Sequence, residues 1–317
     1  MAGGGTITFR DPDGYAAAFG CARVNLTITG AGDFKAQLTR LKLQHVQTYR
    51  CRESLPRIAY ISLSSERVFL SFPLGEQKPV FGSCALLDGD MVLHGRGEHM
   101  HQRSKGACQW GLISFCAEQL ANCGKVLIGE PITPPPASRL LRPSRADALR
   151  FQRLFRQACR LAETKRELIE RPEVARALEH DMLHAIIHCL TADAAGENTR
   201  ARCRHAAVMV RFEELSNRNG QRLSLPKLCA EVGVAERTLR MCCAEFLGVS
   251  PTRYLLLRRL NEARAALRRA DPSKVSVAQV ARNHQFLELG RFAVTYRTTF
   301  GESPSKTLQR DPLAGIA

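Results

Sequence analysis

Long apolar stretches are missing from this 317-residue chain. No run of about 18 consecutive apolar residues occurs, so the sequence predicts no membrane-spanning helix. Residues 1–14 also lack the basic stretch followed by an apolar stretch that marks a secretory signal. We therefore expect a cytoplasmic protein.

The cysteines lack the spacing of metal ligands. The chain has 12 cysteines, yet no two of them form a Cys-x-x-Cys pair. Cysteines in a chain without an export signal are typical of reduced, buried thiols. The sequence therefore predicts no structural zinc site, and we expect neither a metal nor a cofactor.

Acidic residues are scarce, and the basic excess is uneven. The chain carries 46 Lys and Arg against 30 Asp and Glu, a net charge of +16. Residues 199–317 hold 21 basic and 10 acidic side chains, whereas residues 1–198 hold 25 and 20. A basic excess concentrated in one segment indicates a polyanionic partner, although a well-solvated surface would give the same count.

The N-terminal half, residues 19–130, is predicted to be rich in strands. Short runs that alternate apolar with polar residues are separated by turn residues, which favours a barrel or sandwich. A proline-rich segment at 131–144 follows and is expected to be a linker or crossing segment. The predicted strand runs are 24–30, 34–46, 57–64, 67–72 and 84–95.

Helical periodicity begins after Asp147. Apolar residues recur at helical spacing from 149 to 162 and again from 174 to 187, so two amphipathic helices are predicted. Their apolar stripes could form a dimer interface, or they could pack on the chain's own barrel. Residues 191–200 are predicted to link these helices to the C-terminal part.

The C-terminal part contains an internal repeat. Residues 223–251 and 275–304 each predict a short helix, a turn, a longer helix, a glycine and a Ser-Pro pair. Glycine suits the left-handed position after a helix, and the proline beyond it prevents continuation. This order is that of a helix-turn-helix, whose second helix can enter the major groove of DNA. Two copies in a basic segment are a much stronger signal than one.

The segment between the two copies, residues 251–270, is predicted to be one continuous helix. It has no helix breaker after its first proline, and about 18 residues of helix span roughly 27 Å. Since consecutive turns of B-DNA are about 34 Å apart, this rod could hold two reading helices on one face of a duplex. Arg258 and Arg259 could contact phosphate or pair with Glu262, and a structural role is expected for Arg258.

Residues 202–310 resemble the DNA-binding domain of AraC/XylS-type transcriptional regulators. The resemblance rests on the segment 205–234, the block from Leu247 to Leu267, and a closing series of aromatic, Gly and Ser-Pro residues at 286–304. It implies an α+β protein: a β-rich, cupin-like sensor domain (1–140), a helical and possibly dimerising segment (141–195), and an all-α domain with two helix-turn-helix units joined by a linker helix (202–317).

The resemblance also implies which side chains contact DNA. In the first unit the family's base-contact positions match Arg237, Arg240 and Met241, and Thr238 is expected to be exposed beside them. Arginine can pair with guanine through two hydrogen bonds. The alternative is that these arginines contact only phosphate or are solvated.

The second unit departs from the family pattern. Gln285 stands where the turn glycine is usual, and the base-facing positions carry Leu, Gly, Ala and Val side chains. Arg291 and Arg297 remain as expected phosphate contacts, which position a protein without reading sequence. We therefore expect the first unit to specify the operator and the second to anchor the domain.

A ligand site in the N-terminal domain is expected near residues 94–110. His99 and His101 would share one face of a strand, and Trp110, the only tryptophan, could line a pocket or belong to the core. Basic side chains nearby favour an anionic ligand. A metal-dependent cupin enzyme would need a further carboxylate where the chain has Gln, Arg, Ser and Lys, so no metal and no catalytic residues are predicted.

These observations predict a sequence-specific transcriptional regulator, expected to be an activator and not an enzyme, that binds double-stranded promoter DNA under control of an unknown small-molecule effector. The resemblance implies a homodimer and contact with RNA polymerase. The alternatives are a metal-dependent cupin-type enzyme fused to a DNA-binding domain, a DNA-repair methyltransferase fused to a similar reader, or a regulator controlled by a protein partner.

Overall fold

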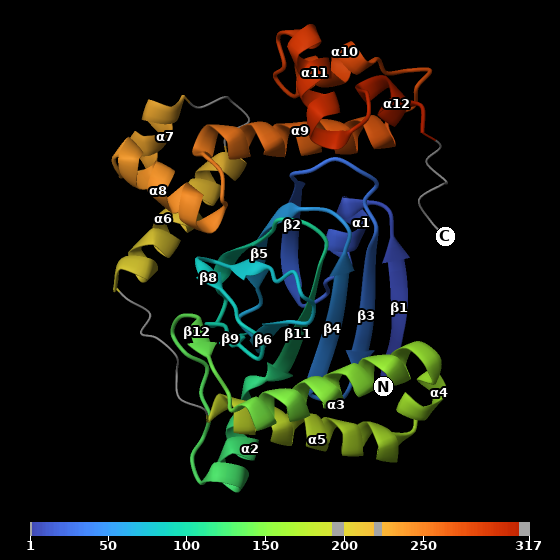
Figure 1. The fold of residues 1–317 in the computed structure, drawn as a ribbon, viewed down its shortest axis with the longest axis vertical. Coiled ribbons are helices and arrows are strands. Elements are labelled where there is room, and N and C mark those ends of the chain that lie inside the picture. Colours follow the sequence, from blue (N-terminus) through green and yellow to red (C-terminus); the bar gives the residue numbers. More distant parts are fainter. Residues whose placement is uncertain (1, 192–199, 219–223, 311–317) are drawn as a thin grey trace.

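The computed structural model describes residues 2–191, 200–218 and 224–310. Most of the expected linker at 191–200 therefore lies outside the described residues. A β-rich part comes first and a helical part follows (Figure 1). The elements of the β-rich part are β1 (Gly3–Phe9), α1 (Pro12–Ala17), β2 (Ala22–Ile28), β3 (Ala36–Lys42), β4 (Val46–Glu53), β5 (Arg57–Leu63), β6 (Arg67–Pro73), β7 (Val80–Phe81), β8 (Cys84–Ala85), β9 (Met91–Leu93), β10 (His99–Ser104), β11 (Cys108–Cys116), α2 (Ala117–Ile128) and β12 (Arg139–Leu141).

Two antiparallel sheets form the β-rich part. The larger has the order β1-β3-β4-β11-β6-β9-β12, and the smaller has the order β2-β5-β10-β7-β8. Their inner faces share one apolar core, which includes Ile28, Leu38, Ile61 and Leu112. The β-rich, cupin-like expectation is confirmed at the level of a two-sheet β domain. The proline-rich segment at 131–144 contains β12, which pairs with β9 at the edge of the larger sheet.

Several elements differ from the predicted pattern. β1 precedes the predicted strand region, and Gly3, Gly4 and Gly5 carry no apolar alternation that would reveal it. β11 has buried residues on both of its faces, so it lacks alternation as well. Residues 117–128, placed in the strand-rich region, form helix α2.

Three helices follow the sheets: α3 (Arg145–Thr164), α4 (Arg166–Ile169) and α5 (Pro172–Leu190). The apolar stripe of α3 packs on the larger sheet, where Phe151 and Phe155 meet Phe72 edge-to-face at ring centroid distances of 4.8 Å. Met182 and Ile186 of α5 belong to the same core. The stripes are thus covered within the chain, which removes the sequence argument that they need a second copy.

The helical part consists of α6 (Arg200–Arg218), α7 (Leu225–Val232), α8 (Glu236–Phe246), α9 (Pro251–Arg269), α10 (Val277–Asn283), α11 (Leu289–Phe300) and α12 (Pro304–Leu308). Figure 1 shows α9 as a long rod between two helical groups, α6–α8 and α10–α12. The rod buries Tyr254 in the core of the first group, whereas Leu260 and Leu267 contribute to the core of the second. The predicted single linker helix between two units is therefore present. No helix in the described ranges is long and apolar enough to cross a bilayer.

The two parts of the molecule are packed against each other. The side chain of Asn261 on α9 accepts from Ile28 N at 3.0 Å and donates to Ile28 O at 3.0 Å, so it completes the free edge of β2. Arg268 pairs with Asp11 at 3.0 Å near the end of the rod. Backbone atoms also meet, because Gly32 N donates to Phe300 O at 3.3 Å.

Candidate nucleic-acid interface and effector cavity

The first helix-turn-helix unit consists of α7, a turn and α8. Helix α7 ends at Gly233, whose φ of 77° lies in the left-handed region that glycine favours. The next amide, Val234 N, donates back to Cys229 O at 3.1 Å and fixes the turn. Cys229 and Leu239 are buried where the two helices meet.

The second unit repeats this geometry with a different turn residue. Gln285 has a φ of 61°, and it is the one described residue other than glycine with positive φ. Phe286 N donates to Ala281 O at 2.9 Å, which reproduces the Val234–Cys229 hydrogen bond of the first unit. Glutamine therefore replaces the usual glycine in the second turn, while the backbone conformation and hydrogen bond match those of the first turn. A side chain in this conformation carries a conformational cost that glycine would not.

The repeated Ser-Pro pairs begin the helices that follow each unit. Ser250 accepts a hydrogen bond from Arg253 N at 3.3 Å as the N-cap of α9, and Ser303 accepts from Lys306 N at 3.2 Å as the N-cap of α12. The proline comes next, at the first helical position, where its missing N–H costs nothing. The repeated Gly-x-Ser-Pro sequence thus lies where one helix ends and the next begins.

The predicted DNA-contacting side chains of the first unit lie on α8. Arg237, Arg240 and Met241 are exposed, and Thr238 is half-buried. Arg240 pairs with Glu236, one turn earlier, at 2.7 Å. This exposed pair keeps the guanidinium close to the helix at little energetic gain, so a stronger acceptor can displace Glu236.

The corresponding surface of the second unit is more apolar. Val294 is 67% exposed and Leu287 is 85% exposed, whereas Arg291 pairs with Glu288 at 3.1 Å. Arg297 is exposed, and no acidic side chain of the described chain pairs with it. These placements fit an anchoring role for the second unit.

Two arginines of α9, Arg258 and Arg264, form ion pairs within the helical part, and the partner of Arg258 differs from the one considered. Arg258 donates to Glu213 at 2.9 Å and to Asn217 at 2.6 Å, both on α6, and not to Glu262 as the i,i+4 alternative suggested. Arg264 is buried, pairs with Glu302 at 2.8 Å and lies 4.4 Å from the ring centroid of Phe300. These arginines therefore fix the two units to the rod.

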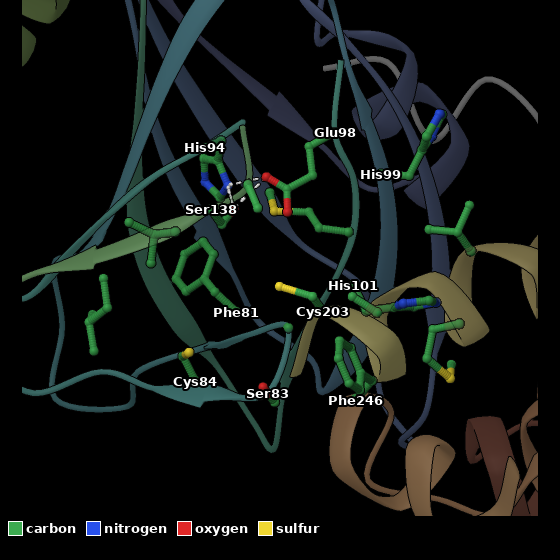
Figure 2. Close-up of a pocket in the computed structure, with 18 residues that line it drawn as sticks. Phe81, Ser83, Cys84, His94, Glu98, His99, His101, Ser138, Cys203 and Phe246 are labelled. Atoms are coloured by element: carbon green, nitrogen blue, oxygen red, sulfur yellow. Dashed lines mark hydrogen bonds and ion pairs between the residues drawn. The ribbon is translucent and has the colours of Figure 1, made fainter. Parts of the chain in front are cut away.

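A cavity of about 170 Å³ lies where the β-rich part meets the first unit. Figure 2 shows Phe81, His94 and Glu98 on the β side and Cys203 and Phe246 on the helical side. Its other apolar walls come from β9, β10, β12 and α6. A preformed, mostly apolar space with a few polar groups is what a small-molecule site requires.

The polar groups of the cavity are already ordered. His94 has one ring nitrogen 2.9 Å from Ser138 Oγ and the other 2.8 Å from Ser71 Oγ. Burial lowers the pKa of His94 to about 4, against an opposing pull from Glu98, so the imidazole is neutral at pH 7. Oε2 of Glu98 accepts from Gly95 N at 2.9 Å and also from Ser138.

A buried polar network adjoins the cavity and joins the two parts. His101 Nε2 of β10 lies 2.8 Å from Glu213 Oε1 of α6, and Tyr254 donates to the same oxygen at 2.5 Å. Arg258 occupies the other oxygen. Burial opposes the charge on Glu213, but its hydrogen bond and attraction to His101, together with Arg258 and Tyr254, lower its pKa below the ordinary value.

The expected ligand residues have separate locations. His99 and His101 line the cavity and share one face of β10, where both rings contact Tyr60. Trp110 is buried in the core, where it donates to Glu53 at 3.1 Å and lies behind Phe81, so it is not itself a lining residue of the cavity. Sequence reasoning missed Glu213 and Phe246, because nothing local in the sequence indicates that α6 and α8 meet β10.

The described residues contain no group of three His, Cys, Asp or Glu side chains placed to hold a metal ion. His94 and Glu98, the nearest candidates to a cupin metal set, hydrogen-bond to serines and backbone instead. The metal-dependent enzyme alternative therefore has no geometric support in this part of the chain.

Comparison with known proteins addresses the helical part. Residues 228–310 match a family model described as a helix-turn-helix domain. A probable thc operon regulatory protein of Rhodococcus erythropolis is 40% identical over 92 residues, which are 29% of this chain and 28% of that protein. A XylDLEGF operon transcriptional activator of Pseudomonas putida is 36% identical over 99 residues, 31% of this chain and 30% of that protein. Residues 228–310 form an AraC-type helix-turn-helix domain.

The matches to these two relatives are confined to about a third of the chain, and they cover less than a third of either relative's length. Among solved structures, the AraC-like transcriptional activator CuxR overlaps 81% of this chain and 94% of its own, at 15% identity and a TM-score of 0.39. The AraC-type domain is thus established by sequence similarity, whereas the β-rich part is described by its own geometry.

Proposed function

We propose that this protein is a sequence-specific transcriptional regulator whose AraC-type domain binds promoter DNA. The observation that carries the proposal is the pair of helix-turn-helix units with the same turn geometry, mounted on the two ends of one helix in the most basic part of the chain. Helix α8 reads bases through Arg237, Thr238, Arg240 and Met241 in this proposal. Helix α11 anchors the domain through Arg291 and Arg297.

The proposal assigns control to a small-molecule effector in the cavity between the β-rich part and the first unit. The cavity walls come from both parts, so a ligand there would change the free energy of their packing. Because Glu213 links β10 to α6 and α9 beside the cavity, the ligand's effect would reach the rod that carries both units. A ligand shifts such an equilibrium only by its difference in affinity for the two arrangements.

Binding of the full chain to fragments of its own genomic neighbourhood tests the proposal. Regulators of this type often act on adjacent genes, so upstream fragments are the first candidates. We expect one fragment to bind at least a thousandfold tighter than a shuffled sequence of the same composition at physiological salt. Equal affinity for all fragments would reject sequence-specific regulation.

Two further parts of the proposal follow from the resemblance. They are activation through contact with RNA polymerase and a homodimer; action in the cytoplasm is proposed from the sequence pattern instead. Sedimentation of the full chain across a range of concentrations, with and without operator DNA, tests the dimer. Control by a protein partner is the alternative to a small molecule, and the cavity favours the small molecule.

A further inference from the structure

The charge of the effector can be inferred from the cavity, and this inference rests on the proposal that the cavity is the effector site. We propose that the cavity takes a small apolar molecule bearing an amine, and that Glu98 selects it. The expectation of an anionic ligand came from basic side chains near Trp110. Arg103 instead packs against the α8–α9 turn at Gly248, and neither Arg103 nor Lys105 lines the cavity.

Glu98 supplies the charge that an amine would meet. Both hydrogen bonds to its carboxylate, from Gly95 N and Ser138, go to Oε2, and Oε1 has no hydrogen-bond partner among the described residues. Figure 2 shows the carboxylate directed into the space bounded by His94, Phe81 and Cys203. An ammonium group there would form a charge-assisted hydrogen bond with Oε1.

Few basic groups face a ligand at the described walls, since the imidazole of His101 is already engaged by Glu213 Oε1 at 2.8 Å. The described residues that line the cavity include no lysine or arginine that could neutralise a carboxylate ligand. His94 is neutral, since burial lowers its pKa to about 4. A carboxylate ligand would therefore face Glu98 with no lysine or arginine of the described walls to offset it, and like charges held this close repel.

The rest of the cavity fits a compact apolar group. A volume of about 170 Å³ is similar to the engineered protein cavity of about 150 Å³ that holds benzene. Phe81 and Phe246 lie on opposite sides of the space, where their rings can contact an apolar group and attract a nearby cation. Arylalkylamines and branched alkylamines of this size are the predicted class.

Calorimetric titration of the full chain with matched ligands tests the inference. Two series keep the apolar group and vary the head: benzylamine, benzyl alcohol and benzoate; then phenethylamine, 2-phenylethanol and phenylacetate. We expect the amines to bind at least tenfold tighter than the alcohols, and the carboxylates at least tenfold weaker. Glu98→Gln keeps an acceptor for Gly95 N and a polar contact for Ser138, so the fold should persist. The Glu98→Gln variant should bind the amines at least tenfold more weakly than the wild type does, and its affinity for the alcohols should change less than threefold.

Glu66→Gln, an exposed turn residue outside the cavity, is the matched control and should alter no affinity. Carboxylates that bind as well as the amines would overturn the charge selection by Glu98 and leave the cavity as a ligand site. No binding in either series would overturn both this inference and the effector part of the proposed function. Operator binding, measured separately, would be untouched by either result.

Discussion

His101 and Glu213 hold the two parts of this protein together. The imidazole belongs to strand β10, the carboxylate belongs to helix α6, and their 2.8 Å contact is buried at the interface. Tyr254 and Arg258 of α9 share the same carboxylate, so a strand of the β-rich part and the rod between the DNA-binding units meet at one side chain.

Glu213→Gln is expected to lower the free energy of unfolding by about 2–4 kcal/mol, because breaking a buried ion pair leaves the guanidinium of Arg258 without its counter-charge. Urea denaturation at pH 7 measures the loss. Glu214→Gln, the exposed neighbour, should change stability by less than about 0.5 kcal/mol. Equal effects of the two variants would mean that the network contributes no more than a surface charge.

The same pair predicts a dependence on pH. The pKa of Glu213 in the folded protein is lowered, so its stabilising contribution is fully present above the ordinary glutamate pKa of about 4.3. The contribution is lost as the pH falls through the lowered pKa, because the unfolded state then binds the proton more readily. The stability difference between the wild type and Glu213→Gln should therefore shrink as the pH falls below about 4. A difference that persists undiminished to pH 3 would contradict the assignment.

The two units are expected to divide the work of DNA recognition. Arg240→Ala should reduce discrimination between the operator and a shuffled sequence by about tenfold to a hundredfold, as expected for loss of one bidentate base contact. Arg297→Ala should weaken binding to both sequences alike and flatten the salt dependence. Fluorescence anisotropy at several salt concentrations measures both effects, with exposed Arg153→Ala on α3 as control. If Arg297→Ala, and not Arg240→Ala, reduced discrimination between the operator and the shuffled sequence, the roles assigned to the two units would be reversed.

Gln285→Gly is expected to stabilise the protein by about 0.5–1 kcal/mol, since glycine adopts a φ of 61° without the steric cost that glutamine carries. Gln285→Ala removes the side chain and keeps the steric cost, so it should not stabilise. Thermal unfolding of the three proteins checks the order. Stabilisation by alanine equal to that by glycine would point to the glutamine side chain, and not the backbone, as the source of strain.

Asn261→Ala should loosen the contact between α9 and β2. It removes both hydrogen bonds to Ile28 and a third to Leu257 O, and it leaves Ile28 N and O without these partners, a cost of about 1–3 kcal/mol. Hydrogen exchange should show faster exchange at the Ile28 amide, whereas exposed Asn283→Ala on α10 should leave it unchanged. Unaltered exchange at Ile28 in Asn261→Ala would mean that other contacts hold the edge of β2.

The helical part could be predicted in detail because its signals are local. Gly233 and Gly301 end helices, Ser250 and Ser303 begin them, and buried positions such as Leu239 follow the helical period. Because the same pattern of helices, glycine and Ser-Pro occurs twice, each copy supported the prediction made from the other. The one mistaken detail, the partner of Arg258, concerned a side chain whose choice depends on where α6 lies.

The β-rich part was predicted only as a class, because strand pairing joins residues far apart in sequence. Sheet order and the burial of Trp110 against Glu53 depend on such pairings, and so does the position of His101 at the interface. The cavity itself needs two parts of the chain that are about a hundred residues apart. His99 and His101 were found from their spacing. The role proposed for Glu98 depends on the cavity walls that α6 and α8 supply, which the sequence around Glu98 does not indicate.

Hydroxyl-radical footprinting of the full chain on its operator tests most directly whether both units bind one duplex. Reading helices on the two ends of α9 should protect two patches on the same face, about one helical turn or roughly 34 Å apart. Arg297→Ala should weaken protection at one patch and Arg240→Ala at the other. A single protected patch, or two patches on opposite faces of the duplex, would contradict the central claim.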